Sequence, residues 1–99
     1  MKYKYIGIFN IDEDKVYAHI PDLPGCITTG RDLNDAITQL TDAASLWLVV
    51  AEDKGDDIPE ASPQSSFEIE TGMVCSTINV DTVTYRSEIE ANNYLKNVS

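Results

Sequence analysis

The sequence has few basic residues and no long apolar run. Seven Lys and Arg stand against seventeen Asp and Glu, which gives a formal net charge of −10. Proteins that hold nucleic acid cluster Lys and Arg against the phosphates, so this balance argues against direct DNA or RNA binding. It favours basic protein partners and fast encounter with them. No apolar run approaches the roughly 20 residues of a membrane span, and no signal-peptide pattern opens the chain. We therefore expect a cytoplasmic protein without a membrane segment.

Side chains that could carry out catalysis are also scarce. The single histidine, His19, lies in a strand-like stretch beside Pro21, so no nucleophilic triad can be built. Cys26 and Cys75 lie in apolar stretches, and with one histidine they make no convincing zinc set; we expect them to stay reduced and to pack as small hydrophobes. A metal-dependent nuclease needs carboxylates that converge from separate elements, but residues 3–10 contain none. We expect no enzyme activity, no metal and no cofactor.

The hydrophobic pattern changes its period at Asp32, and this change predicts an α+β fold. Before this position, residues 3–10, 16–20 and 26–30 are rich in β-branched and aromatic side chains, which predicts three strands. A charged turn at 12–15 links the first two strands. Short links of this kind favour a three-stranded antiparallel meander.

A long helix is predicted from Leu33 to Lys54, on one face of the sheet. Asp32 can cap the first turn of this helix, and Gly55 is a natural stop. Polar residues, among them Ser45 and Glu52, fill its other faces. Apolar residues recur at three- and four-residue steps and form the stripe that should cover the sheet: Leu33, Ile37, Leu40, Ala44, Trp47, Leu48 and Ala51.

The last third of the chain predicts a loop, a fourth strand and a short C-terminal helix. Residues 56–67 are rich in Pro, Ser and acidic side chains, as loops are, and a strand pattern returns within 73–81. Residues 68–70 are a further candidate strand. The S-x-x-E pattern that begins at Ser87 is a capping box, and it predicts a last helix over 88–96.

The segment between the second and third predicted strands has a distinctive composition. Two prolines fix φ, and Gly25 permits a positive φ, so Pro21–Gly25 should form a stiff loop. A conformational clip that joins two strands and a loop that binds a partner both explain these residues. The loop and its flanks resemble the signature of the HicB antitoxin family, and the resemblance covers Tyr3 to about Pro63: Ile20-Pro21-Asp22-Leu23-Pro24-Gly25-Cys26-Ile27-Thr28-Thr29-Gly30.

This resemblance implies a truncated ribonuclease-H-like domain, which we place at residues 1–83, without the acidic nuclease site. It also implies a partner, because family members bind and silence HicA, a small toxin that degrades mRNA through a fold similar to double-stranded-RNA-binding domains. Family members commonly dimerise, so we expect a homodimer. Many carry a C-terminal DNA-binding module, but the tail at 84–99 is too short for one and holds only two basic residues, Arg86 and Lys96.

We expect the partner-binding side chains to lie on loops and turns, where acidic groups can meet a basic toxin. Tyr17 is the predicted apolar anchor among them. The alternative is an orphan HicB-like protein that binds nucleic acid or regulates without a toxin partner. The complete predicted set consists of Asp12, Asp14, Tyr17, Asp22, Asp32 and Asp35.

Overall fold

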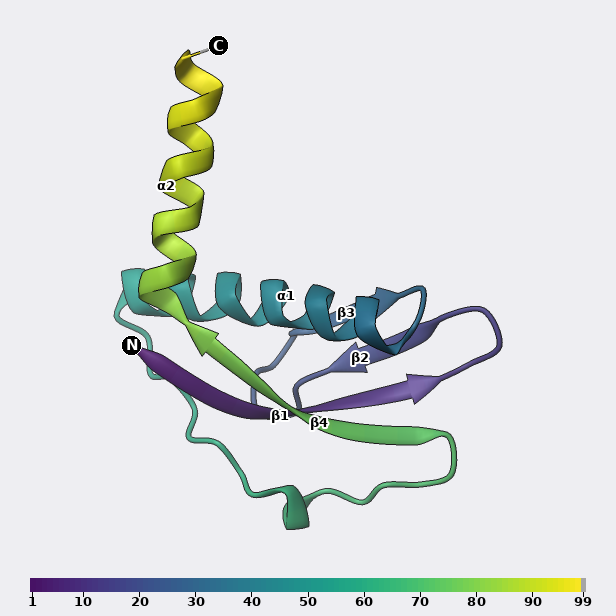
Figure 1. Ribbon diagram of the computed structural model, residues 1–99. Coiled ribbons are helices and arrows are strands. Elements are labelled where there is room, and N and C mark those ends of the chain that lie inside the picture. The colour runs from purple at the N-terminus through teal and green to yellow at the C-terminus, as the bar shows by residue number, and fades with distance from the viewer. Residues whose placement is uncertain (99) are drawn as a thin grey trace.

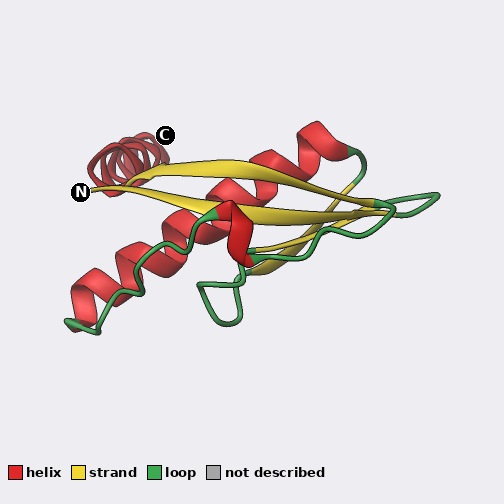
Figure 2. Cartoon of the chain, turned by 90° about the horizontal axis from the view of Figure 1, so that it is seen from below, coloured by secondary structure: helices red, strands yellow, loops and turns green. Residues whose placement is uncertain are grey.

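The structure is a computed structural model that describes the backbone of residues 1–98 and the side chains of residues 1–91. The elements are β1 (Lys2–Ile11), β2 (Val16–His19), β3 (Ile27–Gly30), α1 (Leu33–Lys54), the short 3-10 helix η1 (Gln64–Ser66), β4 (Met73–Asp81) and α2 (Thr82–Val98). The four strands form one antiparallel sheet in the order β3-β2-β1-β4, and this α+β fold confirms the prediction. Helix α1 lies across one face of the sheet, and the segment between α1 and β4 passes round the other side (Figure 1, Figure 2).

The core lies between α1 and one face of the sheet. Phe9 of β1 and Leu40 and Leu48 of α1 have no exposed surface, whereas Ile37, which we predicted in the same stripe, is only half-buried at its margin. Gly7 explains how close the layers come, because a Cβ on Gly7 would lie 2.8 Å from Cδ2 of Leu40. A glycine in the middle of a strand therefore marks close approach of the helix.

Local capping fixes both ends of α1, and the predicted bounds are confirmed. The Asp32 carboxylate accepts a hydrogen bond from the Asp35 backbone N–H at 2.8 Å, which satisfies a free donor of the first turn. Gly55 ends the helix with φ of 70°, a conformation that glycine adopts without strain. Neither described helix combines the length and the apolar character that crossing a bilayer requires.

Helix α2 begins six residues earlier than the predicted helix over 88–96, so this part of the prediction is wrong. The Asp81 carboxylate accepts hydrogen bonds from the backbone N–H groups of Val83 and Thr84 at 3.1 and 3.4 Å, and Asp81 rather than Ser87 caps the helix. The helix follows β4 without a loop, and Ser87 lies inside it.

The candidate strand at 68–70 is also absent, because these residues lead directly into the turn before β4. There the Met73 N–H donates to the Glu70 carbonyl at 3.0 Å. The predicted tail 84–99 ends at Ser99, which lies outside the described residues.

Candidate partner-binding surface

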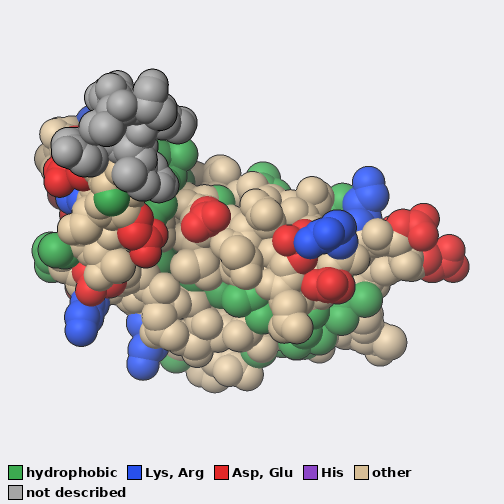
Figure 3. Space-filling model, turned by 45° about the horizontal axis from the view of Figure 1, so that its top comes forward, with side chains coloured by type: hydrophobic (Ala, Val, Ile, Leu, Met, Phe, Trp, Pro, Cys, Tyr) green, Lys and Arg blue, Asp and Glu red, His purple; other side chains and the backbone are tan. Residues whose placement is uncertain are grey.

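The turn between β1 and β2 presents three acidic side chains to solvent, Asp12, Glu13 and Asp14. The turn is closed by the Asp12 N–H, which donates to the Lys15 carbonyl at 2.9 Å, and the Asp12 carboxylate accepts from the Glu13 N–H at 2.8 Å. Figure 3 shows acidic side chains gathered at this tip of the molecule. Within the described side chains, none of the three acids forms an ion pair. Their charge is therefore available to a partner.

Two large apolar side chains are exposed on the face of the sheet opposite α1. Tyr17 lies next to this turn, and Ile27 lies farther along, opposite His19 at the other end of β2. Alternation buries Val16 and Ala18 and turns Tyr17 outward, where it is 43% exposed. Ile27, on the neighbouring strand, is 69% exposed and belongs to the same face. Tyr17 and Ile27 line a hollow of about 330 Å³ together with the Pro21–Gly25 loop. We call Asp12, Asp14, Tyr17 and Ile27 the hairpin surface.

Ile27 is not among the contact residues predicted from the sequence, although the alternation of its strand points to it. Cys26 is buried and Thr28 is half-buried, so the alternation of β3 turns Ile27 outward. A β-branched apolar residue at an outward position of a half-covered sheet is a candidate contact residue. The composition of residues 26–30 predicts a strand, but it does not by itself say which face of that strand the helix covers.

Asp32 and Asp35 lie at the same end of the sheet as the hairpin, because β3 ends opposite Val16 and α1 starts there. Both carboxylates already have local partners. Asp32 caps α1, and Asp35 accepts from the Arg31 backbone N–H at 2.9 Å and from Arg31 Nε at 3.5 Å. The backbone hydrogen bond from Arg31 is the main cause that lowers the pKa of Asp35 below its usual value. The hydrogen bonds of these two acids stabilise the first turn of α1.

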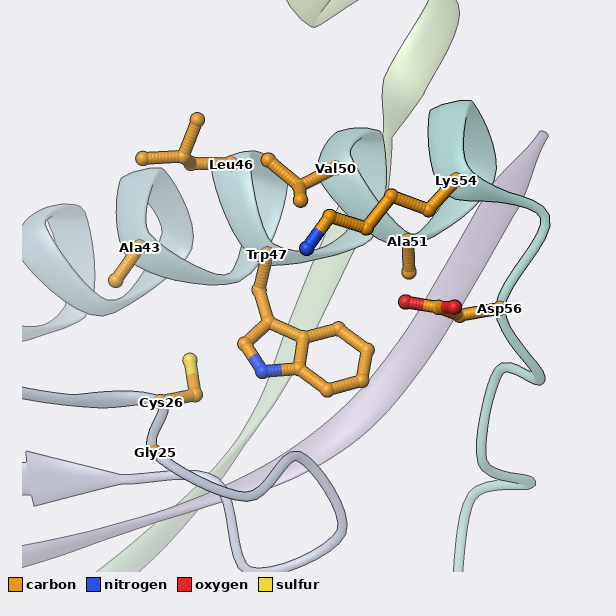
Figure 4. A pocket seen from close by; sticks show the side chains of 9 residues that line it. All are labelled: Gly25, Cys26, Ala43, Leu46, Trp47, Val50, Ala51, Lys54 and Asp56. Atoms are coloured by element: carbon orange, nitrogen blue, oxygen red, sulfur yellow. The ribbon is translucent and has the colours of Figure 1, made fainter.

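Asp22 lies at the opposite end of β2, away from the other predicted site residues. Its carboxylate accepts from the Ser62 backbone N–H at 2.7 Å and from Ser62 Oγ at 2.8 Å. Trp47 Nε1 donates to the Pro24 carbonyl at 2.9 Å, and Leu23 is buried. Figure 4 shows the Trp47 ring reaching from α1 toward the loop, beside a hollow of about 500 Å³. The Pro21–Gly25 loop is thus clamped to α1 and to the following segment, and one of its sides borders the hairpin surface.

A second acidic site, centred on Glu52, was not anticipated from the sequence. The Glu52 carboxylate accepts hydrogen bonds from the Tyr3 hydroxyl at 2.7 Å, from Thr82 Oγ1 at 3.0 Å and from Arg86 Nη2 at 3.1 Å. Arg86 also donates to Asp53 at 2.8 Å, and the Met1 amine donates to Thr82 Oγ1 at 3.1 Å. We call this group the Glu52 cluster. It joins β1, α1 and α2.

The protonation of the Glu52 cluster follows from these contacts. Burial raises the pKa of Tyr3 to about 12, and the hydrogen bond to Glu52 adds to the shift. Burial also opposes ionisation of Glu52, but the hydrogen bonds from Tyr3, Arg86 and Thr82 outweigh it and lower the pKa of Glu52. Glu52 is therefore ionised at neutral pH and links α1 to β1 and α2 through hydrogen bonds. It does not act as a general acid.

The remaining candidate reactive groups are the Cys26 thiol and the potential metal ligands. Burial raises the pKa of the Cys26 thiol to about 11, so this cysteine is a protonated core side chain at neutral pH. Among the described residues, no three His, Cys, Asp or Glu side chains lie together in a group that could hold a metal ion.

Comparison with solved structures finds proteins with the same fold. The chain is similar to a protein in the "Toxin-Antitoxin complex from Streptococcus pneumoniae", with a TM-score of 0.76 and 18% identity over 86% of this chain and 73% of the other. It is also similar to the N-terminal domain of Burkholderia pseudomallei antitoxin HicB, with a TM-score of 0.65 and 22% identity over 82% and 99%. A third similar chain comes from a HicA3 and HicB3 toxin-antitoxin complex, with a TM-score of 0.64 and 15% identity over 80% and 99%.

These structures show the fold, and the sequence shows the family. No curated relative matches the chain. The family model described as "HicB_like antitoxin of bacterial toxin-antitoxin system" matches residues 5–95, which is nearly the whole chain. The chain therefore belongs to the HicB-like antitoxin family.

Proposed function

We propose that this protein is an antitoxin that binds a small basic toxin of the HicA type in the cytoplasm and blocks the toxin's contacts with RNA. The observation that carries the proposal is the hairpin surface, where exposed acids at the turn and two exposed apolar side chains follow one face of β2 and β3. A toxin that grips RNA needs a positive surface for the phosphates. An acidic tip can cover that surface and compete with phosphate for it.

The parts of the hairpin surface have different tasks in this proposal. Asp12 and Asp14 steer the basic toxin toward the hairpin, so they chiefly set the association rate and its dependence on salt. Tyr17 and Ile27 are the apolar anchors that supply most of the affinity. Asp22, Asp32 and Asp35 contribute to the negative field, although their carboxylates are held by local hydrogen bonds.

We also propose how the rest of the chain takes part. Residues 1–83 form the toxin-binding domain, and residues 84–99 form a C-terminal tail. The chain forms a homodimer and does not hold DNA or RNA by itself, because seventeen acidic residues outweigh seven basic ones. The orphan role, without a toxin, is the alternative that the following experiment decides.

The experiment measures binding of a purified HicA-type toxin, encoded beside this protein, at several salt concentrations. Asp12→Lys with Asp14→Lys should slow association several-fold at low salt and matter less at high salt. Glu88→Lys with Glu90→Lys is the matched control, because it makes the same change in net charge on exposed positions of α2. Equal effects of the two double variants would show that only net charge matters.

A second pair of variants tests the anchors. Ile27→Ala should raise the dissociation rate about tenfold, as loss of an interface anchor does. Val83→Ala removes a similarly exposed β-branched side chain from α2 and should leave the rate unchanged. If no small basic protein is encoded nearby, or if one neither co-purifies nor loses its toxicity on co-expression, the antitoxin proposal fails in favour of the orphan role.

A further inference from the structure

The two edges of the sheet differ in length and in charge. β3, at one edge, has four residues, whereas β4, at the other edge, has nine. Residues 73–80 of β4 include no charged side chain and no proline, in a chain where 24% of residues are charged. Proteins usually protect long edge strands with lysine, proline or a bulge, because a bare edge pairs with another strand. β4 lacks the lysine and the proline.

Hydrogen bonds at the ends of the β1–β4 ladder show which backbone groups of β4 are unpaired. The Ile11 N–H donates to the Gly72 carbonyl at 2.9 Å, and the Thr82 N–H donates to the Met1 carbonyl at 3.0 Å. Even-numbered residues along β4 therefore bond to β1, because hydrogen-bonded pairs alternate in an antiparallel ladder. The N–H and C=O groups of the odd-numbered residues Cys75, Thr77 and Asn79 consequently point away from the sheet.

The same reasoning shows that the β3 edge is a poorer template. The Ile20 N–H donates to the Cys26 carbonyl at 3.1 Å, so the even-numbered residues of β3 bond to β2. Only Ile27 and Thr29 then direct their backbone groups outward. The next residue, Arg31, already donates its N–H to the Asp35 carboxylate.

The charge distribution indicates which molecule pairs with the β4 edge. A basic partner would be drawn to the acidic surfaces rather than to an uncharged strand. Two copies of this chain, each with a net charge of −10, repel one another over most of their surfaces, and the uncharged stretch of β4 is where they can meet at least cost. An antiparallel pair of identical strands is self-complementary, as a two-fold interface requires.

We propose that β4 pairs antiparallel with β4 of a second copy, about a two-fold axis at Thr77. This register overlaps all nine residues and places Thr77 opposite Thr77 and Cys75 opposite Asn79. The outward groups then form about six interchain backbone hydrogen bonds. Odd-numbered residues face odd-numbered ones, so both α1 helices cover the same face of one continuous eight-stranded sheet. The inference rests on the homodimer proposed above and is independent of toxin binding.

The first test compares one substitution at the two edges. Thr77 and Thr29 are both exposed threonines whose N–H groups point away from the sheet. Proline removes only an outward donor at either position, so the ladder inside the monomer keeps its bonds. In sedimentation velocity at tens of micromolar, the wild type and Thr29→Pro should be dimers and Thr77→Pro a monomer. Thr77→Lys and Thr29→Lys repeat the comparison if proline impairs folding.

The second test uses a disulfide to verify that Thr77 lies opposite Thr77 of the second copy. In a Cys75→Ser background, Thr77→Cys should form a disulfide-linked dimer under mild oxidation, because opposed residues of a hydrogen-bonded pair have Cα atoms about 5.5 Å apart, within disulfide range. Thr29→Cys in the same background should stay unlinked. A dimer that persists in Thr77→Pro and Thr77→Lys would overturn the β4 interface while leaving the homodimer intact. A monomeric wild type would overturn both, without touching toxin binding.

Discussion

The two ends of the sheet carry acidic side chains in opposite situations. At the hairpin end, Asp12, Glu13 and Asp14 point into solvent without ion pairs among the described side chains. At the other end, the Glu52 carboxylate of α1 accepts three hydrogen bonds, one from β1 and two from α2. A net charge of −10 therefore has two components with different physical roles. Acids in solvent shape the field that a partner meets, and enclosed acids hold the fold together.

The largest loss in the free energy of unfolding should come from removing the Glu52 carboxylate. Glu52→Ala leaves Tyr3, Thr82 and Arg86 without their shared acceptor and should lower the free energy of unfolding by about 2–3 kcal/mol. Asp53→Ala is the control, because Asp53 is 62% exposed and, among the described side chains, accepts from Arg86 alone. Its loss should lower the free energy of unfolding by less than about 1 kcal/mol. Urea melts of both variants measure the contrast, and equal losses would contradict it.

Acid should weaken the Glu52 end in a predictable range. The folded pKa of Glu52 lies below its unfolded value of about 4.3, so its stabilising effect is complete above that pH and is lost as the pH falls through the folded pKa. The stability difference between the wild type and Glu52→Gln should therefore narrow from pH 7 to pH 3. Urea melts along that series check it, and a constant difference would refute the assigned role.

A smaller loss is expected where an acid is held by one partner. Asp22→Ala removes both hydrogen bonds from Ser62 and should destabilise the protein by about 1 kcal/mol. Ser62→Ala keeps the backbone donor and should cause a smaller loss. Thermal melts of the two variants rank them, and the reverse order would show that the loop does not depend on Asp22.

The smallest effect should come from the hairpin tip. Asp12→Asn with Asp14→Asn should change the free energy of unfolding by no more than about 0.5 kcal/mol, because neither side chain forms an ion pair in the described part of the chain. The same double variant should still slow association with a basic toxin. A large change in the free energy of unfolding would show that the hairpin acids, like Glu52, stabilise the fold.

Local signals explain why the extent of α1 could be predicted from the sequence. Asp32, Gly55 and the apolar stripe all act within one helix, so their meaning does not depend on the rest of the fold. The start of α2 was harder, because Thr82, Val83 and Thr84 have a composition typical of strands. Asp81, which caps this helix, was interpreted as the end of β4.

The Glu52 cluster could not be predicted for a different reason. Its hydrogen-bond partners lie 30 to 49 positions away in the sequence. Periodicity places Glu52 off the apolar stripe of α1, which is correct, but only the tertiary fold brings Tyr3 and Arg86 to it. The hairpin acids show the opposite case, because a run of charged residues between two strands is already sufficient to predict exposure.

The hydrogen bond between Trp47 and the Pro24 carbonyl gives the protein a built-in optical probe. Trp47 is the only tryptophan in the chain, so all indole fluorescence arises from this contact point between α1 and the Pro21–Gly25 loop. Emission wavelength depends on how polar the surroundings of the indole are. Any event that lifts the loop from the helix, or covers it with another molecule, can be followed by label-free spectroscopy in real time.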